Sequence, residues 1–493
     1  MKPFERLHVY PPRYGPEWGS GGVFGLKYHR GVLYYTLAFE AEAHFIRDDV
    51  DHVYRFEQVG PAPHSGGDTY SAVDAVDEYI YFGGWVHAPA VYKGKNPDGS
   101  ATIDFKNKYS HVHEYDVNED RVRLLWKESI HRDKEWAGEI SNILYDPVND
   151  QLLLSRLDGH ANLGVYSMDR RSGSIKKLSD VPSLKSTLIH DLACFEMSRA
   201  GIFPAVYGLQ FLDLVNKKLE MVKVPDETFS TFSLDGGPVE MPTIGTMASA
   251  YLRVFTFLRG GLLTYDVVER TWTFIRLFDF LSGYGPFRTV ALNLGGGVLV
   301  AFNAFTHGVW HLSSIPKEMV RRLNFIVGPS VLLYITPPTA RILLALGARI
   351  TSFERIGDTL VLGTSTVANL GGLDATPIDS GYRELLAVSL SRLLSSPPPS
   401  LEFLVPADFI LDKHFGGIPL LGYRDPRLII RTSKDMKLEI YEYGVFLEPL
   451  EAYKDVVSLR KGRNIIELSG YQGIVSFRLS EPDPKAIIRI RLQ

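Results

Sequence analysis

Apolar and polar positions alternate along most of the chain in short runs, and these runs form a repeating pattern. Between about residues 21 and 400, a polar or glycine-rich lead-in, an apolar strand, a short turn and a strongly apolar strand recur about seven times, each time followed by two more polar strands. The spacing of roughly 50 residues is that of propeller repeats. The pattern predicts a β-propeller of about seven blades, and six or eight blades stay open because residues 312–346 can be divided in more than one way.

The clearest repeat runs from Glu139 to Leu178, where DPVND, DGHAN and DRRSG separate four short strands. Four strands joined by three tight turns make one propeller blade. Long helical periodicity is nearly absent, so we expect an all-β fold. The N-terminal strand is a candidate to close the ring of blades.

The run SSPPPS at residues 395–400 has the composition of a linker. The segments LIIRTS, KLEIYEY and IVSFRLS that follow it resemble a small, jelly-roll-like β-sandwich. We therefore expect the propeller over residues 1–400 and a β-sandwich accessory domain over residues 401–493. Such modules often bind glycans, and a structural cap or an oligomer contact is an alternative with at least equal support.

Composition narrows the choice of partners and compartment. The net charge of -4 gives no global basic field, so nucleic acid is not an expected partner, although a basic and aromatic insertion at residues 92–109 keeps a weaker RNA hypothesis open. The single cysteine, Cys194, cannot form an intrachain disulfide. The N-terminus lacks the apolar core of a signal peptide, and prolines interrupt the most apolar tract, residues 323–346, so we expect no membrane span and a cytoplasmic location.

In a propeller, the loops that lead into each first strand and those that join the second strand to the third open on the same face, where function usually gathers. Histidines and carboxylates recur in these loops. The candidate metal ligands are His44, His87, His160, His190 and His307, and the candidate acid/base residues are Asp68 and Glu139. Imidazoles from several blades can surround one divalent transition metal or hold a small molecule, and a nearby carboxylate can move protons. The alternative is that these histidines hydrogen-bond to the backbone or to water.

Two further features are expected to be structural. His111 and His113 share one face of a strand and form a possible metal-binding pair, but they fall in an outer strand, so a solvated edge is favoured. Cys194 lies in an apolar strand, which favours a buried, inert thiol.

Three stretches resemble two known families. LIHDLACF at residues 188–195 resembles the His-Asp motif of carotenoid cleavage oxygenases, and THGVWH at residues 306–311 resembles their last histidine motif. This resemblance covers only these residues and implies a seven-bladed propeller that holds Fe(II) through four histidines. Residues 147–173 resemble an archaeal propeller family of unknown function, and this resemblance would cover nearly the whole chain. It implies the propeller fold and a thermophilic archaeal origin, and it does not indicate an activity.

Two functional hypotheses follow from the sequence. In the first, the histidine-rich funnel face binds a small molecule or a metal, with hydrolase, lyase or oxygenase chemistry as an open question. In the second, the protein is a non-catalytic scaffold that binds a protein or a glycan through the propeller face or the C-terminal domain.

Overall fold

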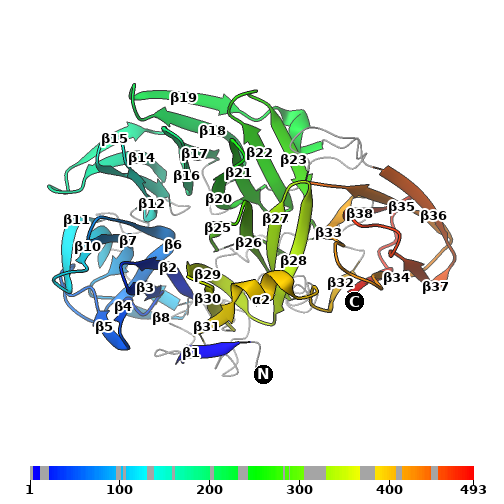
Figure 1. Cartoon of the computed structure of the whole chain (residues 1–493), viewed down its shortest axis with the longest axis horizontal. Coiled ribbons are helices and arrows are strands. Elements are labelled where there is room, and N and C mark those ends of the chain that lie inside the picture. Colours follow the sequence, from blue (N-terminus) through cyan, green and yellow to red (C-terminus); the bar gives the residue numbers. More distant parts are fainter. Residues whose placement is uncertain are drawn as a thin grey trace.

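The computed structural model describes residues 4–11, 22–95, 101–103, 107–129, 138–157, 162–199, 205–230, 242–280, 284–287, 289–304, 329–366, 383–406, 413–445 and 453–493. Within these ranges the chain consists almost entirely of β-strands, arranged as a ring of sheets with a smaller unit attached at one side (Figure 1). The prediction of an all-β fold is confirmed.

Each of the first four blades has four antiparallel strands in chain order from the inside of the ring outward, and a parallel pairing of inner strands joins blades 2 and 3 into one eight-stranded sheet. Blade 1 contains β2 (Val23–His29), β3 (Val32–Leu37), β4 (Glu42–Arg47) and β5 (Val50–Tyr54). Blade 2 contains β6 (Ser65–Val76), β7 (Tyr79–His87), β10 (Lys108–Asp116) and β11 (Arg121–Ser129), with the hairpin of β8 (Tyr92–Lys95) and β9 (Ala101–Ile103) between its middle strands. Blade 3 contains β12 (Ile140–Asp146), β13 (Gln151–Leu157), β14 (Asn162–Asp169) and β15 (Ile175–Ser179). Blade 4 contains β16 (Ser186–Ile189), β17 (Leu192–Ser198), β18 (Val206–Asp213) and β19 (Lys218–Lys223), and the 3-10 helix η3 (Asp226–Ser230) follows it.

The remaining three blades complete the ring. Blade 5 contains β20 (Ile244–Ala250), β21 (Arg253–Leu258), β22 (Gly261–Asp266) and β23 (Trp272–Arg276). Blade 6 contains β25 (Ala291–Leu294), β26 (Gly297–Ala304), β27 (Ser330–Thr336) and β28 (Thr339–Leu346), and the short β24 (Tyr284–Gly285) also pairs with β26. Blade 7 contains β29 (Arg349–Ile356), β30 (Thr359–Ser365), β31 (Arg383–Ser389) and, as its outermost strand, the N-terminal β1 (Glu5–Tyr10).

The ring closes between blades 7 and 1. The innermost strands follow one another around the centre, and β29 contacts β2 (Figure 1). The hydroxyls of Tyr10 on β1 and Tyr35 on β3 share a hydrogen bond, and Arg383 on β31 forms a buried ion pair of 2.6 Å with Glu40 of blade 1. Because β1 completes blade 7, strands from the two ends of the propeller sequence lie in one sheet, which is how propellers avoid an open edge.

One end of the blades is built from repeated aspartate turns. In each, an aspartate at the end of a strand accepts the backbone N–H groups two and three residues later, at 2.7–3.1 Å; the aspartates are Asp116, Asp146, Asp169, Asp213 and Asp266. These side chains satisfy N–H groups that the strand ladder leaves unpaired, as in an Asx turn. We call this end of the propeller the turn end.

After blade 7, the helix α2 (Leu390–Ser395) leads to two four-stranded antiparallel sheets. The first has the order β32 (Leu401–Pro406), β39 (Ile487–Leu492), β34 (Arg427–Thr432) and β37 (Gly462–Glu467). The second has the order β33 (Phe415–Pro419), β38 (Ile474–Leu479), β35 (Met436–Tyr443) and β36 (Tyr453–Leu459). Together they form a β-sandwich beside blades 5 and 6.

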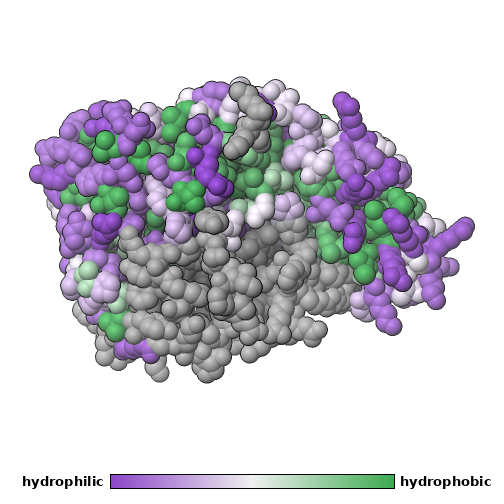
Figure 2. Space-filling view, turned by 90° about the horizontal axis from the view of Figure 1, so that it is seen from below, coloured by the Kyte–Doolittle hydropathy of each residue, from purple (hydrophilic) through white to green (hydrophobic). Residues whose placement is uncertain are grey.

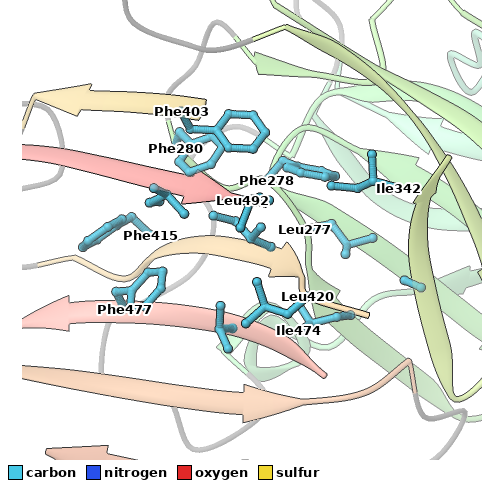
Figure 3. Close-up of a cluster of buried hydrophobic side chains, with 14 of the residues drawn as sticks. Leu277, Phe278, Phe280, Ile342, Phe403, Phe415, Leu420, Ile474, Phe477 and Leu492 are labelled. Carbon is cyan, nitrogen blue, oxygen red and sulfur yellow. The ribbon is translucent and has the colours of Figure 1, made fainter. Parts of the chain in front are cut away.

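The sandwich and the propeller share one buried apolar cluster. Phe278 and Phe280, which follow blade 5, pack on Phe403 of β32 with ring centroids 5.9 and 5.1 Å apart (Figure 3). Backbone hydrogen bonds of 2.7 and 2.9 Å join Asp279 to Gly416 of β33. Burial of this many aromatic rings across the contact predicts that the two units behave as one body.

Among the residues that the structure describes, no helix has the length and apolar character needed to cross a membrane.

Candidate functional site

The connections between strands differ greatly between the two ends of the propeller. At the turn end, the connections within blades contain two to five residues. At the opposite end, which we call the loop end, the fully described connections reach six residues between β15 and β16 and ten residues between β5 and β6. Long connections on a rigid scaffold are where binding residues usually lie, so the loop end is the place to look for a site.

A hollow opens at the loop end of blade 4. It has a volume of about 430 Å³, is open to solvent, and is lined by Pro182, Ser198, Arg199 and Tyr207. Arg199 is exposed and Tyr207 is half-buried. Ligand sites commonly have volumes of about 300–1,000 Å³ and a few polar groups that orient the ligand. The volume of the hollow falls within this range, and Ser198, Arg199 and Tyr207 supply polar groups at its wall.

A buried acid lies directly beneath this hollow. Ser198 donates its hydroxyl to the carboxylate of Glu196 at 3.1 Å, and Glu196 itself is completely shielded from solvent. The same carboxylate accepts the backbone N–H groups of Leu184 at 2.5 Å and Lys185 at 2.8 Å, and the hydroxyl of Ser183 at 3.0 Å. The acid on β17 thus fixes the loop of residues 180–185, which forms one wall of the hollow.

The protonation of Glu196 is sensitive to its surroundings. Burial raises the pKa of Glu196 to about 7, although the N–H groups of Leu184 and Lys185 act in the opposite direction by favouring the charged form. An acid that changes charge near neutral pH beside a cleft is a typical property of functional sites. Among the described side chains that line the hollow, only Ser198 hydrogen-bonds to this acid.

The loop that Glu196 holds also reaches the centre of the ring. The buried Lys185 donates its ammonium group to Ser71 of β6 at 2.5 Å, and Ser71 donates to the amide oxygen of Asn142 on β12 at 3.1 Å. Asn142 in turn donates to the hydroxyl of Ser186 at 2.5 Å. The backbones of Ser71 and Asn142 are paired in parallel, which brings the inner strands of blades 2 and 3 together. These bonds join the innermost strands of blades 2, 3 and 4.

A second polar cluster lies at the loop end of blade 2. His87 ends β7, where it is opposite Lys108 of β10, and its ring is 5.4 Å from Trp85. The buried ammonium of Lys108 is 3.0 Å from the carboxylate of Glu139, which precedes β12. Glu139 therefore takes part in an ion pair that links blades 2 and 3. The acid/base role expected for Glu139 stays a prediction.

His44 lies in β4, with its Nδ1 atom 2.8 Å from Asp51 and its ring stacked on Tyr35 at 4.8 Å. Burial opposes the charged imidazolium, but the contacts with Asp51 and Glu42 outweigh it and raise the pKa of His44. These contacts link His44 to the closure between blades 1 and 7, and its role as a metal ligand stays a prediction.

The prediction that His190 leads into a first strand at the loop end is wrong. His190 is an exposed residue of the two-residue turn between β16 and β17, with a φ of 52°, so it lies at the turn end, away from His87. Asp68 lies within β6, opposite Gly84, rather than in a loop. His160 and His307 lie outside the described residues. Within the described ranges, no group of three or more His, Cys, Asp or Glu side chains is arranged to hold a metal ion.

His111 and His113 are buried, and the expectation of a solvated edge is wrong. Their Nδ1 atoms are 3.0 Å apart, and His113 also bonds to the hydroxyl of Tyr54 at 2.9 Å. Burial lowers the pKa of His111 to about 3 and that of His113 well below its usual value, so both rings are neutral. The neighbouring blade 1 supplies the cover, through Tyr54 and Phe56. The buried thiol expected at Cys194 is observed, and burial raises its pKa well above the usual value.

Sequence reasoning missed the hollow and the acid beneath it. The sequence did contain a signal for the buried acid, because Glu196 is the one charged residue in the apolar strand LACFEMS. A glutamate is rarely buried unless other groups pair with it. The partners could not be read in advance, since Leu184 and Lys185 contribute backbone N–H groups, which every residue type carries.

The sheets define the protein as a seven-bladed β-propeller joined to a β-sandwich, within the described part of the chain. A family model described as "Uncharacterized protein conserved in archaea (DUF2139)" matches residues 33–373. The chain belongs to this family. The curated proteins gave no match.

Solved structures show distant likeness. The chain is similar to Saccharomyces cerevisiae Sqt1, with 9% identity, a TM-score of 0.39, and coverage of 72% of this chain and 80% of the other. It is similar to YCF48 from Cyanidioschyzon merolae, with 11% identity, a TM-score of 0.39, and coverage of 78% and 100%. It also resembles the extracellular domain of the putative hybrid two component system BT4673 from B. thetaiotaomicron, with 14% identity and a TM-score of 0.36, covering 60% of this chain and only 31% of that one. At these values the likeness carries no functional argument.

Proposed function

We propose that the protein binds a small anionic molecule in the hollow at the loop end of blade 4. The observation that carries this proposal is the bond between Ser198, which lines the hollow, and the buried acid Glu196. The exposed guanidinium of Arg199 would hold the anionic group of the ligand, because its planar set of donors matches carboxylate and phosphate oxygens. The ring of Tyr207 offers an apolar and hydrogen-bonding wall.

The protonation of Glu196 sets the expected pH dependence of binding. Below pH 7 the acid is mostly neutral, and above pH 7 it carries a negative charge close to the bound anion. Like charges repel more strongly in a partly dehydrated site than in water, so the affinity for an anion falls as the pH rises through 7. The acid thus couples ligand binding to pH.

The histidine-based metal site is not part of this proposal. His190 lies at the turn end, while His87 lies at the loop end, so these two candidate ligands do not face one ion. The small-molecule half of the first hypothesis is retained, with Arg199 and Ser198 in place of the histidines.

A thermal-shift screen at pH 6 tests the proposal. Phosphate, sulfate, mono- and dicarboxylates and nucleotides are added singly to the full chain, and the best ligand is then titrated against Arg199→Met. We expect that variant to lose the stabilising shift. Arg460→Met, which removes an exposed arginine of the sandwich, serves as the matched control and should keep the shift. Equal shifts for the wild type and Arg199→Met would overturn the proposal.

A further inference from the structure

The outward face of one sheet of the sandwich carries five arginines. In the sheet of β32, β39, β34 and β37, alternate residues point into the core, as the buried Leu428, Ile430, Ile488 and Ile490 show. The other residues point outward; they are Glu402, Leu404, Arg427, Ile429, Arg431, Arg463, Ile465, Glu467, Ile487, Arg489 and Arg491. We call these residues the arginine face. In Figure 2 the sandwich, at the right, shows hydrophilic side chains gathered around a smaller hydrophobic patch.

The strand register places like charges directly opposite one another on this face. Arg427 of β34 is opposite Arg491 of β39, and Arg431 of β34 is opposite Arg463 of β37. Directly opposed like charges destabilise an antiparallel sheet. Arg427 is also opposite Glu467, and Arg491 is also opposite Glu402, whereas the register gives Arg431 and Arg463 no carboxylate neighbour, so the fold alone gives no reason for the second pair.

The two arginine pairs differ in how their charge is compensated. Arg427 forms ion pairs with Asp425 at 2.8 Å and Glu467 at 3.2 Å. For Arg431 and Arg463, no carboxylate among the described residues forms an ion pair. The ion pairs of Arg427 show that carboxylates can pair with arginines on this sheet. Carboxylates of another molecule could pair with Arg431 and Arg463 in the same way.

Aliphatic side chains lie between the arginines. Across the middle of the face, Leu404, Arg489, Ile429 and Ile465 are neighbours on successive strands. Ile465 is 50% exposed and Ile487 is 47% exposed. Aliphatic side chains interspersed with arginine and without lysine fit the composition of protein interfaces, in which arginine is enriched and lysine is depleted. The face carries no aromatic side chain, so it lacks the stacking platform that single-stranded nucleic acid uses.

We propose that the arginine face docks an acidic segment of a partner protein. Carboxylates of that segment pair with Arg431 and Arg463, and its aliphatic side chains cover Ile429, Ile465 and Ile487. Strand spacing and rise give four strands with three outward positions each an area of roughly 400 Å². This is below the roughly 800 Å² per partner of a standard interface, so the contact is weak and reversible. It is independent of ligand binding at blade 4.

Fluorescence anisotropy with the full chain tests the proposal at low salt. The probe is a labelled twelve-residue peptide of alternating glutamate and leucine; a peptide with serine in place of leucine and a mixed-sequence DNA duplex are compared with it. We expect the glutamate–leucine peptide to bind most tightly. The double variant Arg431→Gln with Arg463→Gln should weaken that binding at least about tenfold, which is about 1.4 kcal/mol.

Two matched variants separate recognition from bulk charge and from misfolding. Lys223→Gln with Lys437→Gln removes two exposed charges that lie off this face, and it should keep the affinity within about twofold. The double arginine variant should melt at the same or a higher temperature than the wild type, because one like-charge pair is removed. No peptide binding, or equal binding by the double arginine variant, overturns the proposal. Tighter binding of the duplex than of either peptide also overturns it, in favour of nucleic acid.

Discussion

Ser198 donates its hydroxyl to Glu196 at 3.1 Å, and this bond connects an open hollow with a completely buried acid. The same acid holds the backbone of Lys185, whose ammonium reaches Ser71 of another blade. A change of charge at Glu196 therefore alters the hydrogen bonds that lead to the hollow and those that lead to the inner strands. This relationship is the basis of the proposed pH-dependent binding.

Replacing Glu196 with glutamine should remove a pH dependence of stability. The folded state raises the pKa of Glu196 from 4.5 to about 7 by burial, so this group favours folding most below pH 4.5 and loses that contribution as the pH rises through 7. The loss amounts to about 3 kcal/mol. Urea unfolding of the wild type and Glu196→Gln at pH 5 to 8 measures it. If the free energy of unfolding changed with pH in the same way for both proteins, Glu196 would not be the source of this pH dependence.

His111 should act on stability with the opposite sign. Burial lowers its pKa from 6.5 to about 3, so its contribution is fully present above pH 6.5 and is lost as the pH falls toward 3. At pH 4.5 the loss is about 3 kcal/mol. In acid unfolding experiments, His111→Gln should show a shallower loss of stability below pH 6.5 than the wild type. A His111→Gln protein that loses stability as steeply as the wild type would contradict this prediction.

The closure between blades 7 and 1 should depend on β1 more than on any one of its side chains. Tyr10→Phe removes the hydroxyl that bonds to Tyr35 and should cost about 1 kcal/mol. Deleting residues 1–11 removes the whole outer strand of blade 7 and exposes the ladder of β31, so it should lower the melting temperature by several times as much. Calorimetry of both variants compares them. A truncated protein as stable as Tyr10→Phe would show that the strand does not close the ring.

Phe403 should hold the sandwich and the propeller in one cooperative unit. Its ring packs against Phe278 and Phe280 (Figure 3) and also against Tyr284, and all three are buried. We expect a single calorimetric transition for the wild type, and a cost of about 3–5 kcal/mol for Phe403→Ala. If the wild type already unfolds in two independent steps, the shared cluster does not couple the two units.

The repeat pattern was sufficient to predict the propeller because its turns are local. DPVND and DRRSG each begin with an aspartate that forms a turn with the residues directly after it. In the structure, Asp146 and Asp169 form these turns. The proposed boundary between the two units at residue 400 stays a prediction.

The candidate site depended on longer-range order that the sequence does not reveal. The strand that contains Cys194 was taken as the first strand of blade 4, whereas β17 is the second, so His190 was placed at the wrong end of the blade. His111 was expected to be solvated because its strand is an outer one, yet side chains from blade 1 cover it. The hollow depends on residues 182 and 207, which are brought together only by the sheet.

A crystal structure determined after a bromide soak would show where the protein binds an anion. At pH 6 we expect anomalous density in the hollow, in contact with the guanidinium of Arg199. The density should be weaker at pH 8, where Glu196 is charged, and absent in Arg199→Met. Bromide bound only elsewhere on the protein, or bound equally in Arg199→Met, would contradict an anion site at blade 4.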